Sequence, residues 1–274
     1  MNKMRIKSPV TVLCLLLLSA CNSPSEESVN NQSTGLCELV ENSCTFVLLD
    51  EATSTYTIIN SNRAYTRFTP ASTFKIANSI IALETGTLSG TDVSLRVDLD
   101  AYPQQDWWQP AWATDSYNLR GAFQNSVFPI YRSIAADIGE QNMQTYLNNF
   151  AYGNQDISSG LDNFWVAGSL AISAVEQVDF LRELNRNGYG LSDNSMNGLR
   201  EIMLVEESGS HQLYAKTGAA LLEDGNVVFW YVGFIEKENG VHYFAFNMHR
   251  PPSPENAQLR IELSREYLRR FGVI

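Results

Sequence analysis

The order of strand-like and helix-like segments constrains the fold of this chain more than any other feature of its sequence. Short β-branched runs at residues 45–49 and 54–59 come early, and three longer strand-like runs lie near the other end. Between them, apolar residues recur at the three- and four-residue spacing of helices. This order predicts an α/β (α+β) fold with a central antiparallel sheet flanked by helices. We expect one domain over 37–274, with a helical insertion at about 85–206.

The expected elements can be placed from their periodicity and their boundary residues. Thr69 followed by Pro70 is typical of a helix cap and a first helical residue, and predicts a helix that runs to about Glu84. The runs at 45–49 and 54–59 predict a hairpin at the edge of the sheet, because only a short turn separates them. Further expected helices span 127–138, 143–150, 172–187, 195–206 and 257–270, and further strands span 212–216, 227–235 and 241–248.

Residues 1–20 have the composition of a secretory signal peptide, because basic residues precede an apolar run and no acidic residue occurs. The apolar run is too short to be a good membrane span. The LSAC sequence that ends at Cys21 resembles the bacterial lipobox, in which the cysteine is lipidated; ordinary cleavage after Ala20 is the alternative. We therefore expect a periplasmic protein that a lipid anchors to the membrane, with a flexible polar tether over 21–36.

The charge balance and the histidines disfavour two classes of function. The formal net charge is −11, and it becomes −14 when the three basic residues of the signal peptide are removed. Nucleic acid is a poor partner for such a chain, because phosphate binding needs a basic face. His211, His242 and His249 form neither a His-x-His nor a His-Glu-x-x-His pair, so we expect no metal site. Catalysis must then use hydroxyls, lysines or carboxylates.

Two of the four cysteines remain for pairing once the N-terminus is set aside. Cys14 leaves with the signal peptide, and Cys21 would carry the lipid. Cys37 and Cys44 would then share an oxidising compartment, which favours a disulfide between them over two buried free thiols.

Ser72 and Lys75 are the first candidates for catalysis. On a helix their three-residue spacing places the hydroxyl and the amine on one face, where the lysine can serve as a base for a serine nucleophile. If Thr69 caps the helix, the backbone N–H of Ser72 stays available to hold an oxyanion. The spacing alone recurs by chance in many helices. It gains weight from Ser126 and from Lys-Thr-Gly at 216–218, which complete the motif order of the penicillin-recognising serine enzymes.

Two other motifs echo class A β-lactamases but lie in unsuitable places. Ser192 opens a Ser-Asp-Asn sequence only 24 residues before Lys216, where it better fits a helix cap. Glu183 lies in a sequence that echoes a general-base loop, but it better fits a solvated helix face. Without that glutamate, the chain needs another base to release an acyl group.

Several short segments spread over the chain form one combined pattern. They are Pro-Ala-Ser-Thr-Phe-Lys-Ile at 70–76, Leu-Arg-Gly-Ala at 119–122, Ser126, Tyr-Gly-Asn at 152–154, Phe-Trp at 164–165, Ile-Ser-Ala at 172–174, Lys-Thr-Gly at 216–218 and Trp-Tyr-Val-Gly at 230–233. From about Thr45 onward, the chain resembles the class D, or OXA-type, serine β-lactamases. The resemblance implies the β-lactamase/transpeptidase-like fold and the hydrolysis of β-lactam antibiotics.

The resemblance also implies a role for each central residue. Ser72 would be acylated by the β-lactam, and Lys75 would be carbamylated by CO₂ or bicarbonate to become the general base. The indole N–H of Trp165 would hydrogen-bond that carbamate, and Ser126 would pass a proton to the departing lactam nitrogen. Considered alone, Trp165 fits a core tryptophan and Ser126 fits a helix cap.

The residues near Lys75 suit this chemistry, with one departure from the family pattern. Phe74 and Ile76 flank the lysine in sequence. With Phe128 and Trp165 they would form an apolar surround that lowers the pKa of the amine, so that its neutral form can attack CO₂. The family usually carries valine where this chain has Phe128, and we expect the larger ring to change water access to the carbamate.

By the same resemblance, cations would hold the substrate carboxylate. Lys216 and Thr217 would act together with Arg260 of the last helix. The backbone N–H of Ala219, which follows Gly218, would be the second oxyanion donor. These cations must make a local positive site on an acidic chain. Ala219 is smaller than the aromatic residue often found at this position, which leaves the substrate preference open.

Two other functions share this motif order. A penicillin sensor has the same domain but stops at the acyl-enzyme, and a penicillin-binding peptidase acts on cell-wall D-Ala-D-Ala. A sensor is tied to transmembrane helices, which the sequence does not show, and the combination of Tyr-Gly-Asn at 152–154 with Trp165 favours the hydrolases. The expected partners are β-lactam substrates, and a homodimer is compatible with the sequence.

Overall fold

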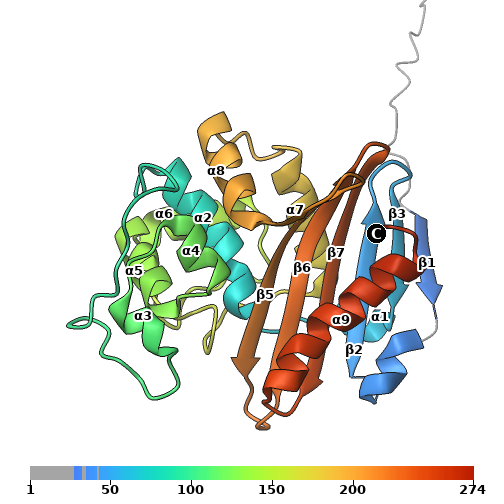
Figure 1. Cartoon of the computed structure of the whole chain (residues 1–274), viewed down its shortest axis with the longest axis horizontal. Coiled ribbons are helices and arrows are strands. Elements are labelled where there is room, and N and C mark those ends of the chain that lie inside the picture. Colours follow the sequence, from blue (N-terminus) through green and yellow to red (C-terminus); the bar gives the residue numbers. More distant parts are fainter. Residues whose placement is uncertain (1–27, 33–34, 42) are drawn as a thin grey trace, which may run out of the picture.

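The computed structural model describes residues 28–32, 35–41 and 43–274, which form a mixed sheet with helices on both of its faces (Figure 1). Residues 1–27 lie outside the described residues, so the signal peptide and the lipidation of Cys21 remain predictions. In the described part of the chain, no helix combines the length and the apolar character needed to cross a membrane.

The sheet has seven strands in the order β1-β3-β2-β7-β6-β5-β4. The six strands from β3 to β4 pair antiparallel, as predicted, and β2 and β3 form the expected hairpin. The outermost strand β1 pairs parallel to β3, so this hairpin is not the edge itself. The strands are β1 (Ser28–Gln32), β2 (Cys44–Asp50), β3 (Thr55–Ile59), β4 (Leu204–Glu207), β5 (Gln212–Leu221), β6 (Val227–Lys237) and β7 (Gly240–Arg250).

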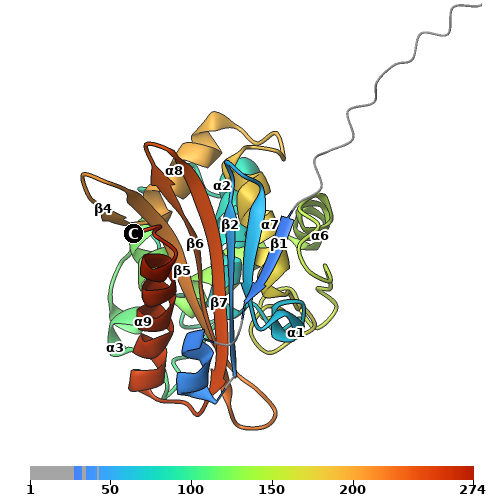
Figure 2. The same cartoon turned by 90° about the vertical axis from the view of Figure 1, so that its right-hand side faces the viewer.

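Most helices form a layer on one face of the sheet, and α9 covers the other face (Figures 1 and 2). The predicted helical character of the middle of the chain is confirmed, and so is the final amphipathic helix. The helices are α1 (Ser61–Ala64), α2 (Lys75–Glu84), α3 (Pro110–Thr114), α4 (Leu119–Gln124), α5 (Phe128–Ile138), α6 (Glu140–Asn149), α7 (Ala174–Asn185), α8 (Asp193–Met203) and α9 (Pro254–Arg270), with 3₁₀ turns η1 (Gly35–Val40) and η2 (Ala71–Phe74).

The alternation of side chains along β5 assigns its residues to two separate cores. Tyr214 packs in the core beneath the helical layer, whereas Leu213 and Ala215 pack in the core beneath α9. Successive side chains of a strand point to opposite faces, so the next residue, Lys216, is directed to the helical-layer side. The alternation along β5 therefore places the buried Lys216 at the boundary between the sheet and the helices.

Two sequence expectations are wrong in part. The tether predicted over 21–36 includes Ser28–Gln32, which pairs with Thr55–Ile59, because an outer strand needs only backbone hydrogen bonds and tolerates polar side chains. The helix predicted over 195–206 ends at Met203. The following residues pair with β5 as strand β4, so tertiary pairing overrides their helix propensity.

A disulfide joins Cys37 in η1 to Cys44 at the start of β2, with 5.3 Å between the Cα atoms. Both cysteines are fully buried beneath α9. The Tyr267 hydroxyl of α9 accepts a hydrogen bond from the Cys37 backbone N–H at 3.1 Å. The bridge therefore attaches the N-terminal turn to the sheet on the face opposite the catalytic candidates.

Candidate active site

The turn that carries Ser72 is a 3₁₀ turn and not the first turn of an α-helix. Ala71 has a positive φ of 51°, and α2 begins only at Lys75. The predicted cap by Thr69 is wrong, because its hydroxyl donates instead to the backbone O of Trp165 at 2.9 Å. Thr69 thus ties the nucleophile turn to the segment that contains Trp165.

Gly218 allows β5 to approach this turn closely. A Cβ atom at Gly218 would lie 3.0 Å from the backbone O of Pro70 and 3.1 Å from Cγ2 of Thr73. Any side chain here would force the strand away from the turn. The contact places Ser72 beside the backbone of the Lys-Thr-Gly strand, where the family resemblance expects the oxyanion donor Ala219.

Lys75 and Ser72 form a buried amine–hydroxyl pair. The Lys75 side chain is fully buried, and its Nζ donates to Ser72 Oγ at 2.8 Å. Burial lowers the pKa of the Lys75 amine to about 7. The amine lies 5.1 Å from the ring centroid of Tyr131 and 5.9 Å from that of Phe128. A large fraction of the lysine is therefore neutral near pH 7, which permits it to act as a base or a nucleophile.

Trp165 completes the apolar surround but leaves one polar atom without a partner. Its ring stacks on Phe74 with a centroid distance of 5.4 Å and meets the edge of Phe128 at 6.1 Å. The residue is fully buried, and its indole Nε1 has no hydrogen-bond partner among the described residues. Such a buried donor suits an acceptor that the unmodified side chains do not provide.

Ser126 and Lys216 form the second hydroxyl–amine pair. Lys216 Nζ donates to Ser126 Oγ and, at 3.0 Å, to the backbone O of Thr217. Burial and the charges of Lys75 and Arg260 hold the pKa of the Lys216 amine well below its usual range. The helix-cap alternative for Ser126 is wrong, because Val127 occupies the N-cap position of α5.

Arg260 reaches the same strand from α9. Its Nη1 donates to the backbone O of Gly218 at 3.0 Å, and its guanidinium carbon lies 5.6 Å from the ring centroid of Phe229. Burial lowers the pKa of Arg260 to about 10, so the group stays cationic at neutral pH. Its Nε also lacks a partner in the described part of the chain. The guanidinium can therefore still bind an anion.

These residues meet at a cleft of about 390 Å³ between β5 and the helical layer. A larger hollow, of about 990 Å³, lies at the far hairpins and contains none of the catalytic candidates, so we assign the chemistry to the smaller cleft. The sequence-predicted residues that line it are Ser72, Ser126, Phe128, Thr217, Gly218, Ala219 and Arg260. Lys75 and Trp165 lie buried behind it.

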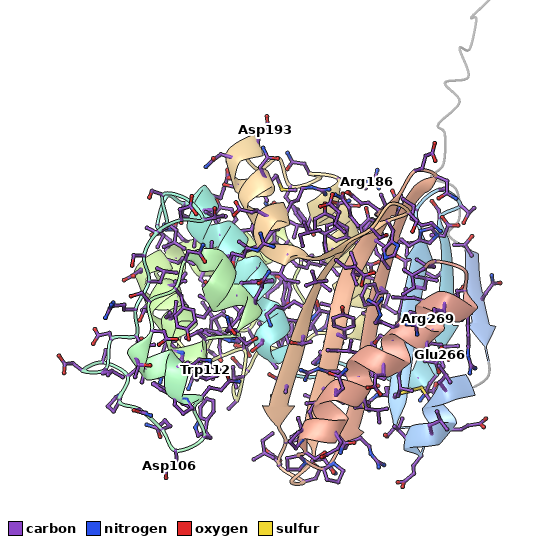
Figure 3. All side chains as sticks on the ribbon, in the orientation of Figure 1. Asp106, Trp112, Arg186, Asp193, Glu266 and Arg269 are labelled. Carbon is purple, nitrogen blue, oxygen red and sulfur yellow. A yellow bond between two sulfur atoms is a disulfide. The ribbon has the colours of Figure 1, made fainter. Side chains whose placement is uncertain are left out.

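The aromatic rim of the cleft was not found from the sequence. Trp107 and Trp112 line the cleft, and 62% of Trp107 is exposed. The Trp107 ring lies 5.9 Å from Phe128, and Trp112 lies on α3 in the helical layer (Figure 3). Three tryptophans within residues 107–112 were the available signal. Gln109, Gln124, Asn125 and Val166 complete the lining.

The Tyr-Gly-Asn motif positions the Trp165 segment and does not enter the cleft. Asn154 Nδ2 donates to the backbone O of Ser169 at 2.7 Å, and its Oδ1 accepts from the Ala171 N–H at 2.9 Å. Gly153 has a φ of 53°, and a Cβ there would lie only 2.1 Å from the Ala171 O. The motif thus fixes both ends of the loop that holds Trp165.

The two class A echoes behave as the sequence suggested. The Ser192 hydroxyl accepts from the Ser195 N–H at 3.3 Å and caps α8. Glu183 on α7 is 45% exposed and pairs with Arg186, the C-cap residue of that helix. Among the described residues, no group of three or more histidine, cysteine or acidic side chains is placed to hold a metal ion.

Comparison with known proteins places this geometry in a family. Residues 44–268 match the penicillin binding protein transpeptidase domain. The chain is similar to β-lactamase OXA-10 of Pseudomonas aeruginosa, with 36% identity over 241 residues that cover 87% of each chain. The solved structure of FUS-1 (OXA-85), a class D β-lactamase from Fusobacterium nucleatum subsp. polymorphum, has a TM-score of 0.80 and 33% identity, covering 87% of this chain and 98% of that one.

A penicillin receptor is also similar. The C-terminal domain of the Bacillus licheniformis BlaR penicillin receptor gives a TM-score of 0.81 and 25% identity, covering 92% of this chain and 100% of that one.

Proposed function

The chain belongs to the class D β-lactamases, and we propose that it hydrolyses β-lactams through an acyl-enzyme on Ser72, with carbamylated Lys75 as the general base. The observation that supports this most directly is the buried Lys75 amine, 2.8 Å from Ser72 Oγ. No glutamate lines the cleft in the described part of the chain to serve as the base instead.

The residues around Lys75 fit a carbamate. Burial lowers the pKa of Lys75 to about 7, so the neutral amine that reacts with CO₂ is available at physiological pH. The partnerless Nε1 of Trp165 offers a donor within the same aromatic surround. A buried donor without a partner costs about 1–3 kcal/mol, which an added carbamate oxygen would offset. Once formed on Lys75, the carbamate would supply an anionic base beside Ser72.

The other residues have roles that their contacts support. Ser72 Oγ would give its proton to the base on Lys75 and attack the lactam carbonyl carbon, forming an ester as the C–N bond breaks. Ser126 would give its hydroxyl proton to the departing nitrogen, and Lys216, which already donates to Ser126 Oγ, would restore that proton. Water would then attack the ester, returning a proton to Ser72 Oγ and releasing the ring-opened acid.

Thr217 and Arg260 would bind the substrate carboxylate. Both line the cleft next to Ser72, and Arg260 retains a buried Nε without a partner in the described part. The Ala219 N–H would stabilise the oxyanion together with the Ser72 N–H. These donors give an acidic protein a local site for an anionic substrate.

The test combines turnover with direct detection of both covalent states. Purified protein is mixed with a chromogenic cephalosporin, with and without bicarbonate, while mass spectrometry follows the acyl-enzyme. Labelling with ¹³CO₂ and NMR then reports the lysine carbamate. We expect turnover that rises with bicarbonate, a transient adduct on Ser72, and a carbamate signal that Lys75→Gln abolishes. Ser72→Ala is the control that should lose the adduct but keep the carbamate signal.

A penicillin sensor is the second candidate, favoured by the similarity to the BlaR penicillin receptor domain. A sensor would be acylated on Ser72 by the same contacts but would not release the acyl group. Persistent acylation without turnover at saturating bicarbonate would establish the sensor. Absence of both turnover and any adduct would reject both candidates in favour of a different acyl donor, such as a cell-wall peptide.

We further propose that Cys21 is lipidated and holds the protein at the periplasmic face of a membrane. The lipobox-like sequence and the signal-peptide composition of residues 1–20 support this. Labelling with an alkyne fatty acid should mark the wild-type chain in the membrane fraction. Cys21→Ala should remove the label and release the protein into the soluble periplasmic fraction; a label that persists would contradict the proposal.

A further inference from the structure

A second groove, outside the catalytic cleft, opens along the outer edge of β5. The short strand β4 pairs only with Gln212 to Tyr214, whereas β5 continues to Leu221. From Ala215 onward, the described residues provide β5 with a strand partner only on its β6 side. Next to Ala215, Lys216 and Thr217, this edge borders a groove of about 480 Å³.

The groove is continuous with the catalytic cleft. Thr217 and Gln124 line both hollows, so they form a shared rim. The helix α9 also contributes to both, with Arg260 in the cleft and Ile261 in the groove. The groove therefore begins at the end of the cleft where Thr217 and Arg260 would bind the substrate carboxylate.

The chemistry of the groove favours an anion with an apolar body. Phe123, Leu204 and Ile261 provide apolar surface, and Arg120 lines the groove as a half-buried cation. Arg120 has neither an ion pair nor a side-chain hydrogen bond within the described residues, unlike Arg132 and Arg200, which pair with acidic side chains. No aspartate or glutamate belongs to the described lining of the groove. An unpaired arginine beside apolar surface suits a carboxylate at the end of an alkyl chain.

We propose that this groove is a second substrate subsite, which binds an apolar arm ending in an anionic group and attached to the carboxylate-bearing ring of a β-lactam. The proposal rests on the proposed function, because that function fixes which end of the substrate meets Thr217. An arm on the neighbouring ring carbon leaves the cleft over the shared rim of Thr217 and Gln124. Its alkyl part contacts Phe123 and Leu204, and its anionic end pairs with Arg120.

The experiment compares two cephalosporins that differ only at the ring carbon next to the carboxylate-bearing carbon. One carries a carbon-linked alkyl arm ending in a carboxylate, and the other has the same arm ending in a primary amide. The carbon link prevents expulsion of the arm during acylation. We measure the second-order rate constant for acylation of Ser72, which is defined for both a hydrolase and a sensor. In wild-type protein at low salt, the carboxylate arm should react about tenfold faster than the amide arm.

Two variants distinguish the effect of Arg120 on the rate ratio from the effect of the protein's overall charge. Arg120→Gln should reduce the ratio of the two rate constants to about one. Arg96→Gln removes an exposed arginine outside the groove and should preserve the wild-type ratio. A third cephalosporin carries only a methyl group at the same ring carbon. Val205→Trp, at a groove position that is 49% exposed, should reduce the rate advantage of the carboxylate arm over this methyl compound.

The outcomes distinguish the subsite from the proposed function. A ratio near one in the wild type, or a ratio that Arg120→Gln leaves unchanged, would overturn the subsite while the β-lactamase function stands. Failure of every cephalosporin to acylate Ser72 would overturn the proposed function, and the subsite with it.

Discussion

Lys75 and Lys216 form the same kind of lysine–serine pair, but their surroundings differ. Each amine is buried, has a lowered pKa and donates to a serine hydroxyl. Lys75 lies among aromatic rings, and burial lowers the pKa of its amine. Lys216 lies on a strand edge, donates also to the Thr217 carbonyl, and is near other cations.

A buried lysine–serine pair can suit two different tasks, depending on what surrounds the amine. An amine whose charge is disfavoured mainly by apolar burial is suited to lose its proton and accept CO₂. An amine held by a carbonyl and a hydroxyl next to the carboxylate site is suited to relay protons and stabilise an anion. In our proposal, the position of each amine relative to the aromatic rings, and not its residue type, would separate the general base from the relay.

Substitution of the two lysines should give the largest effect and should distinguish their roles. Lys75→Gln should lower kcat by about 10³-fold and remove all dependence on bicarbonate, because the proposed general base is lost. Lys216→Gln should slow acylation but keep the ¹³C carbamate signal. Steady-state kinetics and NMR on both variants test this, with circular dichroism to verify folding. Loss of the carbamate signal in Lys216→Gln but not in Lys75→Gln would reverse our assignment.

The next largest effect tests the role of Trp165 in the aromatic surroundings of Lys75. Trp165→Phe keeps most of the ring packing but removes the indole N–H, so carbamate formation should require about tenfold more bicarbonate. The half-saturating bicarbonate concentration for turnover measures this. Trp107→Phe, on the cleft rim, is the matched control and should leave that concentration unchanged. Equal shifts in both variants would mean that the N–H of Trp165 plays no special part.

The pH dependence of stability should also separate Lys75 from an exposed lysine. The folded pKa of about 7 lies below the ordinary value of 10.5, so the unfolded chain binds more protons between these values. The free energy of unfolding should therefore rise with pH from about 7 to 10.5, by up to about 1.4 kcal/mol per pH unit in CO₂-free buffer. Below pH 7 the amine is charged in both states, so the destabilisation caused by burying it should not change with pH.

Urea unfolding of two lysine variants checks this window. Lys75→Met should flatten the rise, whereas Lys237→Met, at an exposed hydrogen bond, should not. Identical pH profiles for wild type and Lys75→Met would contradict the lowered pKa.

The smallest expected effect concerns Phe128, whose ring borders both the cleft and Lys75. Phe128→Val should open a path for water and CO₂, and it should change the bicarbonate dependence of turnover by roughly a few fold. Progress curves after a jump in bicarbonate concentration measure the rate of reactivation. An unchanged dependence would show that the ring does not control access.

The sequence predicted which side chains meet in the site better than it predicted the local backbone that carries them. Ser72, Lys75, Ser126 and Lys216 could be named because their order along the chain is specific, and strand alternation explains why Lys216 reaches the helical layer. The role of Thr69 could not be inferred, because its hydroxyl bonds a segment almost a hundred residues away.

The remaining differences have similar long-range causes. Strand β4 depends on pairing with β5, and β1 depends on the free edge of β3, so neither has a local signal. The tryptophans at 107 and 112 are conspicuous in sequence, but only the packing of Trp107 against Phe128 and of Trp112 against Trp107 shows that they line the cleft. The second groove needs the shortness of β4 and the position of α9, which no local pattern contains.

The two outer strands of the sheet have a consequence for self-association. Both are short, and β4 ends in two glutamates while β1 consists largely of polar residues. Short, charged or polar edges disfavour strand pairing between copies of a protein, even where the inner strands are long and apolar. If lipid anchoring crowds many copies onto one membrane, these edges would help the sheets to remain separate.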